Sequence, residues 1–252
     1  MKKVIFLLLA LTISILTGKN LLSVDAENSA PAAQTIQAEE KQFQHEKTPG
    51  TALSVEKLSE LPAFSGSPYV EVNSNIPFFH GEKPLPDGYE VYSPLDELGR
   101  CGPAEANISP SLMPTEKRGS IGMIKPSGWH TVRYDDIIDD KYLYNRCHLI
   151  GFQLAGENAN KLNLITGTRY LNVVGMLPFE NQLTDYVKKT GNHVRYRVTP
   201  VFHEKDLVAR GVLMEAESVE DNGKGITFNV YCYNVQPGIE IDYRTGDSHA
   251  VQ

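Results

Sequence analysis

The sequence feature that most constrains the fold is a pair of strand-like segments near the C-terminus joined by a turn signal. Residues 225–235 are rich in β-branched and aromatic residues, which favour pleated sheets, and residues 207–218 are largely apolar. Between them stands Asp221-Asn222-Gly223, and Asn-Gly pairs favour the turns that connect antiparallel strands. We therefore expect an antiparallel hairpin over these residues.

Several other segments also have strand character. Residues 194–202 begin with the alternation Val-Arg-Tyr-Arg-Val, and shorter candidates lie at 70–72, 89–92, 130–134 and 141–150. The best helix covers residues 183–189 and follows Pro178, a residue that suits a first helical turn. Many strands and few helices predict an α+β fold, with a central antiparallel sheet and few flanking helices.

The N-terminal segment has the pattern of an export signal. Lys2 and Lys3 precede an uncharged apolar run over residues 4–17, and Val24-Asp25-Ala26 supplies a cleavage-site pattern. The alternative is a membrane anchor, but the run is shorter than the ~20 residues that a spanning helix needs. We expect a signal peptide over residues 1–26 and a secreted, extracellular mature chain that is not held in a membrane.

The next segment differs in composition from the rest. Residues 27–60 are rich in Ala, Glu, Gln, Lys and Ser and show little apolar periodicity, which predicts a flexible leader or linker. Strand patterns begin soon afterwards. We therefore expect one domain over residues 61–252.

Charge and cysteine content narrow the function classes. With 24 basic and 31 acidic residues, the formal net charge is −7, which argues against a protein that coats nucleic acid through bulk charge. A local basic cleft remains compatible with this charge. Cys101, Cys147 and Cys232 are odd in number and lack zinc-ribbon spacing. At most one disulfide can form, and the sequence leaves its pairing open.

The residues that suggest chemistry begin with Asn145-Arg146-Cys147-His148. A neutral histidine is available near pH 7 and can act as a general base. Arg146 is two residues away from His148, so on a strand both side chains share one face. A guanidinium could then bind phosphate beside the base.

Oxygen donors follow this run. Asn172 offers an amide oxygen to Mg²⁺, an ion that prefers oxygen ligands and keeps several waters. Glu180 lies farther along and could hold a metal-bound water. Arg169 is a second candidate for binding phosphate. Hydrolysis of a phosphodiester needs an activated water and neutralisation of phosphate charge, and this set of residues supplies both.

In these motifs the chain resembles the DNA/RNA non-specific endonucleases, which have a ββα-metal core, and it is most similar to the secreted streptococcal nucleases called streptodornases. The signature Asp-Arg-Gly-His, then Asn, then Glu falls on Arg146, His148, Asn172 and Glu180, and an upstream Asn falls on Asn163. The likeness covers residues 95–246 and is densest over 144–182.

The resemblance implies a sequence-nonspecific endonuclease that leaves 5′-phosphate ends. His148 would be the general base, with Glu180 and Arg146 as further catalytic residues. The metal would be one Mg²⁺, with Mn²⁺ as an alternative, on Asn172 and, through water, on Glu180. Substrate contacts would come from Arg146, Arg169 and Asn163. The substrate would be DNA, with RNA as an alternative, and no obligate protein partner is implied.

Two positions depart from the family signature. Asn145 stands where the family has Asp, and Cys147 stands where it has Gly. These departures motivate an alternative function, a secreted binding or host-interaction factor that keeps the nuclease fold without full activity. A cysteine nucleophile beside His148 is disfavoured, because neighbours on a strand point to opposite faces.

Each candidate also has a structural interpretation. Asn172 and Asn163 could support loops, Glu180 could favour a helix start, and Arg146 could pair with Asp139 or Asp140. Two arginines at 195 and 197 could form a basic edge of the cleft or a solvated face. For the single tryptophan, Trp129, we expect core packing, and His130 is not assigned to the site.

Overall fold

The computed structural model describes residues 61–251. The expected signal peptide over 1–26 and the leader over 27–60 lie outside the described residues. Between residues 61 and 251, no helix combines the length and the apolar character needed to cross a membrane.

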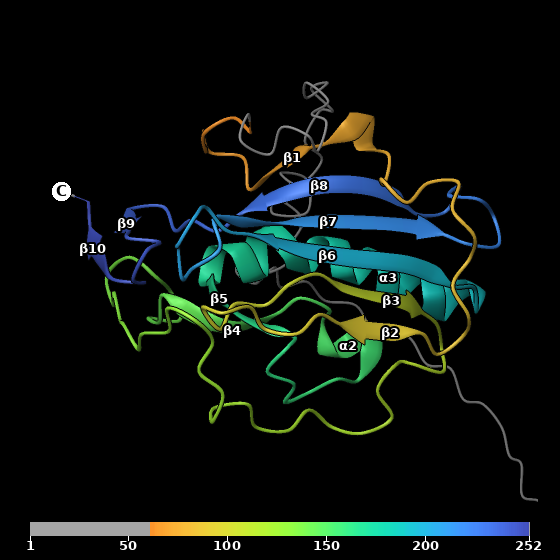
Figure 1. The fold of residues 1–252 in the computed structure, drawn as a ribbon, viewed down its shortest axis with the longest axis horizontal. Coiled ribbons are helices and arrows are strands. Elements are labelled where there is room, and N and C mark those ends of the chain that lie inside the picture. Colours follow the sequence, from red (N-terminus) through yellow and green to blue (C-terminus); the bar gives the residue numbers. More distant parts are fainter. Residues whose placement is uncertain (1–60, 252) are drawn as a thin grey trace, which may run out of the picture. The chain divides into compact units, whose positions relative to one another are not determined.

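The central element is a six-stranded sheet in which every neighbouring pair is antiparallel (Figure 1), which confirms the expected architecture. Its strands, in spatial order, are β1 (Tyr69–Glu71), β8 (Thr227–Tyr233), β7 (Gly211–Ser218), β6 (Val194–Val201), β3 (Ala104–Ile108) and β2 (Glu90–Tyr92).

The hairpin expected from the Asn-Gly pair is present between β7 and β8. Asn222 and Gly223 have φ values of 55° and 78°, the left-handed region that these two residue types tolerate best. The connection is longer than a two-residue turn, since Ser218 N–H still donates to the carbonyl of Ile226.

One long helix covers one face of the sheet. Helix α3 (Leu177–Thr190) lies behind β6 and β7 in Figure 1. It buries Leu183 and Val187 in one cluster with sheet residues such as Val212 and Met214. The helix is longer than the expected 183–189: it starts one residue before Pro178 and ends at Thr190, and Gly191 caps it with φ 74°.

A second, two-stranded ribbon lies beside the sheet and carries the motif residues. β4 (Tyr144–His148) pairs with β5 (Leu164–Thr168), and the short helix α2 (Phe152–Ala155) lies between them in sequence. A single π-helical segment, η3 (Leu171–Met176), then leads directly into α3. This order is the expected ββα unit.

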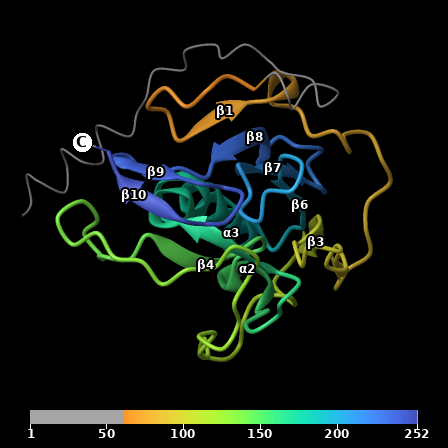
Figure 2. The ribbon, with the colours of Figure 1, turned by 60° about the vertical axis from the view of Figure 1, so that its left-hand side comes forward.

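Some expectations about local structure were wrong. The segment 130–134 forms only an isolated bridge between Arg133 and Tyr142, because the chain turns back immediately over residues 134–141. Strand β3 was missed, since Ala-Glu-Ala-Asn-Ile has few strand-favouring residues. Within the closing segment, β9 (Ile239–Ile241) pairs with β10 (Ser248–Ala250) in a small ribbon near the C-terminus (Figure 2).

The three cysteines are buried in the core and none forms a disulfide. Cys147 and Cys232 belong to the main apolar cluster, where burial raises the pKa of both thiols. Each sulfur contacts a methionine sulfur at 3.5 Å, Met176 for Cys147 and Met214 for Cys232. The Cys232 thiol therefore packs as a small apolar side chain, and the Cys147 thiol does so on the side that faces Met176.

Candidate active site

A cleft of about 790 Å³ opens along the ββα unit. Its charged and amide side chains are Arg118, Asp140, Asn145, Arg146, His148, Gln153, Arg169, Asn172 and Glu180. Its aromatic side chains are Trp129, Tyr142, Tyr144 and Phe152. Of the residues expected to catalyse, bind metal or contact substrate, the fold brings His148, Glu180, Arg146, Arg169 and Asn172 to this cleft, and Asn163 is the exception.

His148 is the last residue of β4 and is 7% exposed. Its Nε2 lies 2.8 Å from the backbone carbonyl of Asn158. A carbonyl can only accept, so the neutral ring carries its proton on Nε2 and leaves the Nδ1 lone pair unprotonated. Burial lowers the pKa of His148, which favours the neutral form that a base needs.

A hydrogen-bonded row of side chains connects Asn172 to the strand beside it. Asn172 Nδ2 donates to Asn145 Oδ1 at 3.2 Å, and Arg169 Nη1 lies 3.4 Å from the same oxygen. The thiol of Cys147 donates to Asn172 Oδ1 at 3.2 Å. Asn145 therefore serves as an acceptor that orients Asn172, a role that needs an oxygen but no negative charge.

Cys147 points away from the cleft and into the core, as the alternation along β4 predicts. Its side chain is fully buried, whereas His148 lines the cleft. Room for the sulfur comes from β5, since a Cβ on Gly167 would lie 2.6 Å from Cys147 Cβ. This placement does not fit a nucleophilic role beside His148.

Glu180 lies in the first turn of α3 and is 8% exposed. Burial raises the pKa of this carboxyl to about 7, and the Gly151 backbone N–H and Arg118 oppose that shift. A Cβ on Gly151 would lie 2.7 Å from Glu180 Oε1. The bare backbone of Gly151 therefore lets the carboxylate fit beside α2.

The donor chemistry of this corner fits a hard divalent cation. Asn172 and Glu180 both line the cleft and offer oxygen atoms, the ligands that such ions prefer. A cation beside the buried Glu180 carboxylate would also favour its ionised form. Within residues 61–251, no group of three or more His, Cys, Asp and Glu side chains forms a metal cage. The site thus fits an ion that keeps most of its waters.

Arg118 is the cleft residue that the sequence interpretation missed. Its Nη2 lies 3.4 Å from His148 Nδ1, so a guanidinium faces the nitrogen that would act as base. It reaches the site from a turn-rich loop, 30 residues before His148 in sequence. Nothing in the composition of that loop distinguishes Arg118 from the other basic residues in loops.

Arg146 lines the cleft as expected but is engaged by the same loop. Its Nε donates to the carbonyl of Ile124 and its Nη2 to that of Gly122 at 2.8 Å. Its guanidinium also lies 4.0 Å from the centroid of the Trp129 ring. These three contacts hold the segment that follows Arg118 in place. We expected Arg146 to be the arginine beside His148, but Arg118 has that position.

The remaining candidates occupy different places. Arg169 pairs with Asp140 at the cleft wall. Asn163 is fully buried, and its amide exchanges two hydrogen bonds with the backbone of Ile150, at 2.9 and 3.0 Å. It therefore holds the segment after β4 in place and does not reach the cleft, which differs from the expected substrate contact.

The two arginines of β6 lie outside the cleft. Arg195 pairs with Glu105 and Glu82, and Arg197 pairs with Glu215. Both stack on Phe79, with guanidinium carbons 4.3 and 5.2 Å from its ring centroid. They form neither a basic edge of the cleft nor a solvated face.

Comparisons with known proteins agree with this geometry. The sequence profile described as "DNA/RNA non-specific endonuclease" matches residues 82–220. The crystal structure of NucA from Streptococcus agalactiae with magnesium ion bound is 26% identical, with a TM-score of 0.63, over 73% of this chain and 86% of that one.

A metal-free NucA structure from the same organism gives a TM-score of 0.65 over 77% of this chain and 92% of that one, at 26% identity. The Sda1 nuclease with bound zinc ion is 30% identical, with a TM-score of 0.55, over 65% of this chain and 81% of that one. Because the matching profile spans more than half of the sequence and includes the cleft residues from Arg118 to Glu180, the chain belongs to the DNA/RNA non-specific endonuclease family and is a nuclease.

Proposed function

We propose that this protein is a secreted, Mg²⁺-dependent endonuclease that hydrolyses the phosphodiester bonds of DNA, with RNA as an alternative substrate. The observation that carries the proposal is the placement of His148. Its Nε2 is occupied by the Asn158 carbonyl, and its Nδ1 faces the cleft beside Arg118. A base and an adjacent guanidinium are what attack of water on a phosphodiester needs.

The metal we propose is one Mg²⁺, with Mn²⁺ as an alternative, on Asn172 and, through water, on Glu180. When bound, this ion would supply positive charge to the phosphate and to the departing oxygen. Magnesium in NucA and zinc in Sda1 support a divalent ion here. Asn145 and Cys147 hold the Asn172 amide from two sides, and Gly151 leaves the space that Glu180 occupies.

In the proposed reaction, His148 Nδ1 takes a proton from a water molecule, and that water attacks phosphorus in line with the 3′ oxygen. The P–O3′ bond breaks and the 3′ oxygen leaves as a hydroxyl after taking a proton from solvent, so the downstream fragment keeps the phosphate at its 5′ end. Arg118, whose guanidinium faces the same nitrogen, would bind a non-bridging phosphate oxygen and stabilise the growing charge. Arg146 would hold the loop after Arg118, and Arg169 would add positive charge at the cleft wall.

Secretion is supported by the N-terminal pattern of two lysines, an apolar run and a small-residue cleavage motif. The mature nuclease domain would cover residues 61–252 after a leader over 27–60. Its substrate would then be nucleic acid outside the cell.

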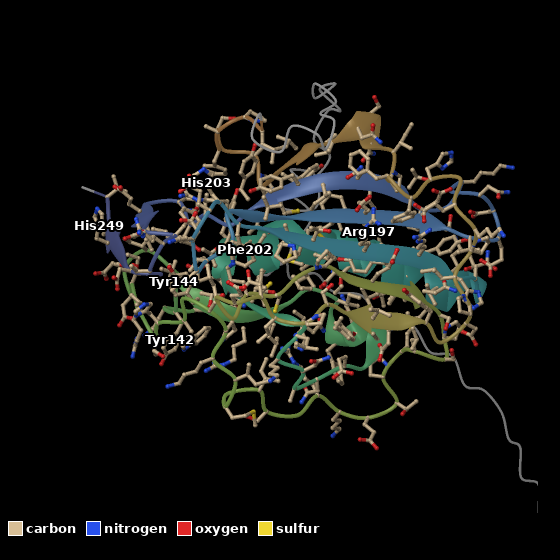
Figure 3. The ribbon with its side chains drawn as sticks, viewed as in Figure 1. Tyr142, Tyr144, Arg197, Phe202, His203 and His249 are labelled. Carbon is tan, nitrogen blue, oxygen red and sulfur yellow. The ribbon has the colours of Figure 1, made fainter. Side chains whose placement is uncertain are left out.

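The test is digestion of plasmid DNA and of a parallel RNA by the wild type and by His148→Ala, with Mg²⁺ or with EDTA. We expect the variant to lose activity about 10²-fold or more, and EDTA to abolish cleavage. His249→Ala is the matched control, because His249 lies on β10 outside the cleft (Figure 3). Undiminished cleavage by His148→Ala, or full activity in EDTA, would refute the mechanism. Ligation of the products without added kinase would verify the 5′ phosphates.

A further inference from the structure

Alternate residues along β4 and just before it present a continuous row to the cleft. Tyr142, Tyr144, Arg146 and His148 all line it, and Asn145 reaches it from between them. Arg146 and His148 belong to the site described above. The two tyrosines extend the same face away from the general base, and no step of the proposed reaction uses them.

The two tyrosines differ in how they meet solvent. Tyr144 is 4% exposed, and its hydroxyl donates to the carbonyl of Gly246 at 2.9 Å. Tyr142 is 46% exposed, although a large aromatic side chain normally buries most of its area. Figure 3 shows the pair following one another on the β4 side of the molecule. Tyr142 is thus an open ring in the same cleft as the reacting groups.

The Tyr142 ring is also held in place. The guanidinium of Arg133 lies 5.4 Å from its centroid, and the backbones of the two residues form a bridge. Asp135 fixes Arg133 through two hydrogen bonds of 3.0 Å. A ring supported by a fixed cation loses little freedom when a flat group stacks on it.

The charge of the cleft indicates what would lie against this ring. Three arginines, Arg118, Arg146 and Arg169, line the cleft against two acidic residues, Asp140 and Glu180, so a polyanion is favoured there although the chain is acidic overall. Tyr142 precedes His148 by six positions, a span of roughly 20 Å if that stretch is extended. A nucleic acid strand with its phosphate at His148 would extend over that length by several nucleotides.

We propose that Tyr142 is a stacking subsite for an unpaired nucleobase of the substrate strand, several nucleotides from the phosphate that is cut. A base inside a duplex has both faces covered by its neighbours, so only an unpaired base can offer a face to the ring. The subsite favours single-stranded over double-stranded segments. This inference rests on the proposed function only in taking nucleic acid as the ligand.

The experiment measures binding without cleavage. Fluorescence anisotropy in EDTA would report the Kd for a labelled single-stranded oligonucleotide and for its duplex with the complementary strand. The proteins are the wild type, Tyr142→Ala, Tyr142→Phe and, as matched control, Tyr89→Ala, since Tyr89 lines a separate hollow that shares no residue with the cleft. Tyr142→Leu keeps the bulk without the ring and replaces the alanine variant if that one unfolds.

We expect Tyr142→Ala to weaken single-strand binding about fivefold or more, with Tyr142→Phe close to the wild type. Duplex binding should change much less. Equal losses on both ligands, or no loss on the single strand, would overturn the subsite. Because EDTA prevents hydrolysis, such a result would leave the proposed nuclease mechanism standing. Conversely, if the wild type showed no cleavage with Mg²⁺, the proposed function would fail, but a selective effect of Tyr142→Ala on single-strand binding would still support the subsite.

Discussion

The side-chain oxygen of Asn145 accepts a hydrogen bond from the side-chain amide of Asn172, with 3.2 Å between the two atoms. The same oxygen faces Arg169. Asn145 stands where the family signature has Asp. This contact shows that Asn145 retains the hydrogen-bond acceptor of the carboxylate without its negative charge. An amide oxygen accepts from Asn172 as a carboxylate would, and the thiol of Cys147 holds the other end of the Asn172 amide.

Removing this acceptor should therefore weaken metal binding. We expect Asn145→Ala to lower Mg²⁺ affinity about 10-fold or more, a typical cost of losing a partner that orients a metal ligand. Asn145→Asp keeps the oxygen and should bind the ion at least as tightly as the wild type. Calorimetric titration with Mg²⁺ in the absence of nucleic acid gives both affinities. Equal affinity of the alanine variant would show that Asn172 needs no support from Asn145.

Arg118 should be as important to turnover as any residue recognised from the sequence. Because it faces His148 Nδ1, we expect Arg118→Ala to lower kcat about 10²- to 10³-fold, the cost of one stabilising donor. Arg118→Lys keeps the charge without the planar fork and should fall in between. Lys117→Ala is the control, since the exposed Lys117 does not line the cleft. Plasmid digestion at saturating Mg²⁺ measures all three, and a change below twofold in Arg118→Ala would reject this role.

Cys147 and Gly167 should be coupled in stability. Gly167→Ala places a Cβ 2.6 Å from Cys147 Cβ, and we expect overpacking to cost about 1–3 kcal/mol. Cys147→Gly alone should also destabilise, because it leaves a cavity and a flexible backbone inside β4. In the double variant the new methyl group fills the space that the Cys147 side chain leaves. Its loss of unfolding free energy should therefore be smaller than the sum of the two single losses. Urea unfolding of the four proteins measures this coupling, and strict additivity would contradict it.

His193 should give the fold a pH-dependent contribution. Its Nδ1 lies 2.6 Å from Glu220 and its Nε2 lies 3.3 Å from Asp87. The hydrogen bond to Glu220, with further help from Asp87, raises the pKa of His193 above 6.5. A raised folded-state pKa stabilises the protein fully below 6.5, and this contribution is lost as the pH rises through the folded-state value.

The measurement is the difference in unfolding free energy between the wild type and His193→Gln. It should be largest in mildly acidic solution and shrink at alkaline pH, and a titration of the histidine ring by NMR gives the midpoint. A difference that is independent of pH, or that grows with pH, would show that these ion pairs contribute nothing through protonation.

The sheet and the reacting end of the cleft could be predicted because their signals are local. The alternation at 194–198, the Asn-Gly turn and the apolar runs around it each lie within one element. His148, Asn172 and Glu180 lie in a single ββα unit, and their match to the family signature is what identified them as one set from the sequence.

Arg118 and Gly151 could not be found in the same way. Arg118 meets His148 across 30 residues of loop, strand and turn that show no period. Position 151 needs a glycine only because the packing of α3 brings the Glu180 carboxylate against its backbone. The role of Arg146 depended on where two loop carbonyls and Trp129 lie, which the strand pattern does not contain.

The state of the cysteines has a practical consequence for handling the protein. Cys101, Cys147 and Cys232 are unlinked and buried, so no covalent bond ties distant parts of this domain together. Its assembly does not require an oxidant or a disulfide isomerase, and the domain should reach the same structure in a reducing cytoplasm as in an oxidising medium. Purification with a thiol reductant is then compatible with full activity, and heating exposes three thiols at once, which makes their reactivity a direct reporter of unfolding.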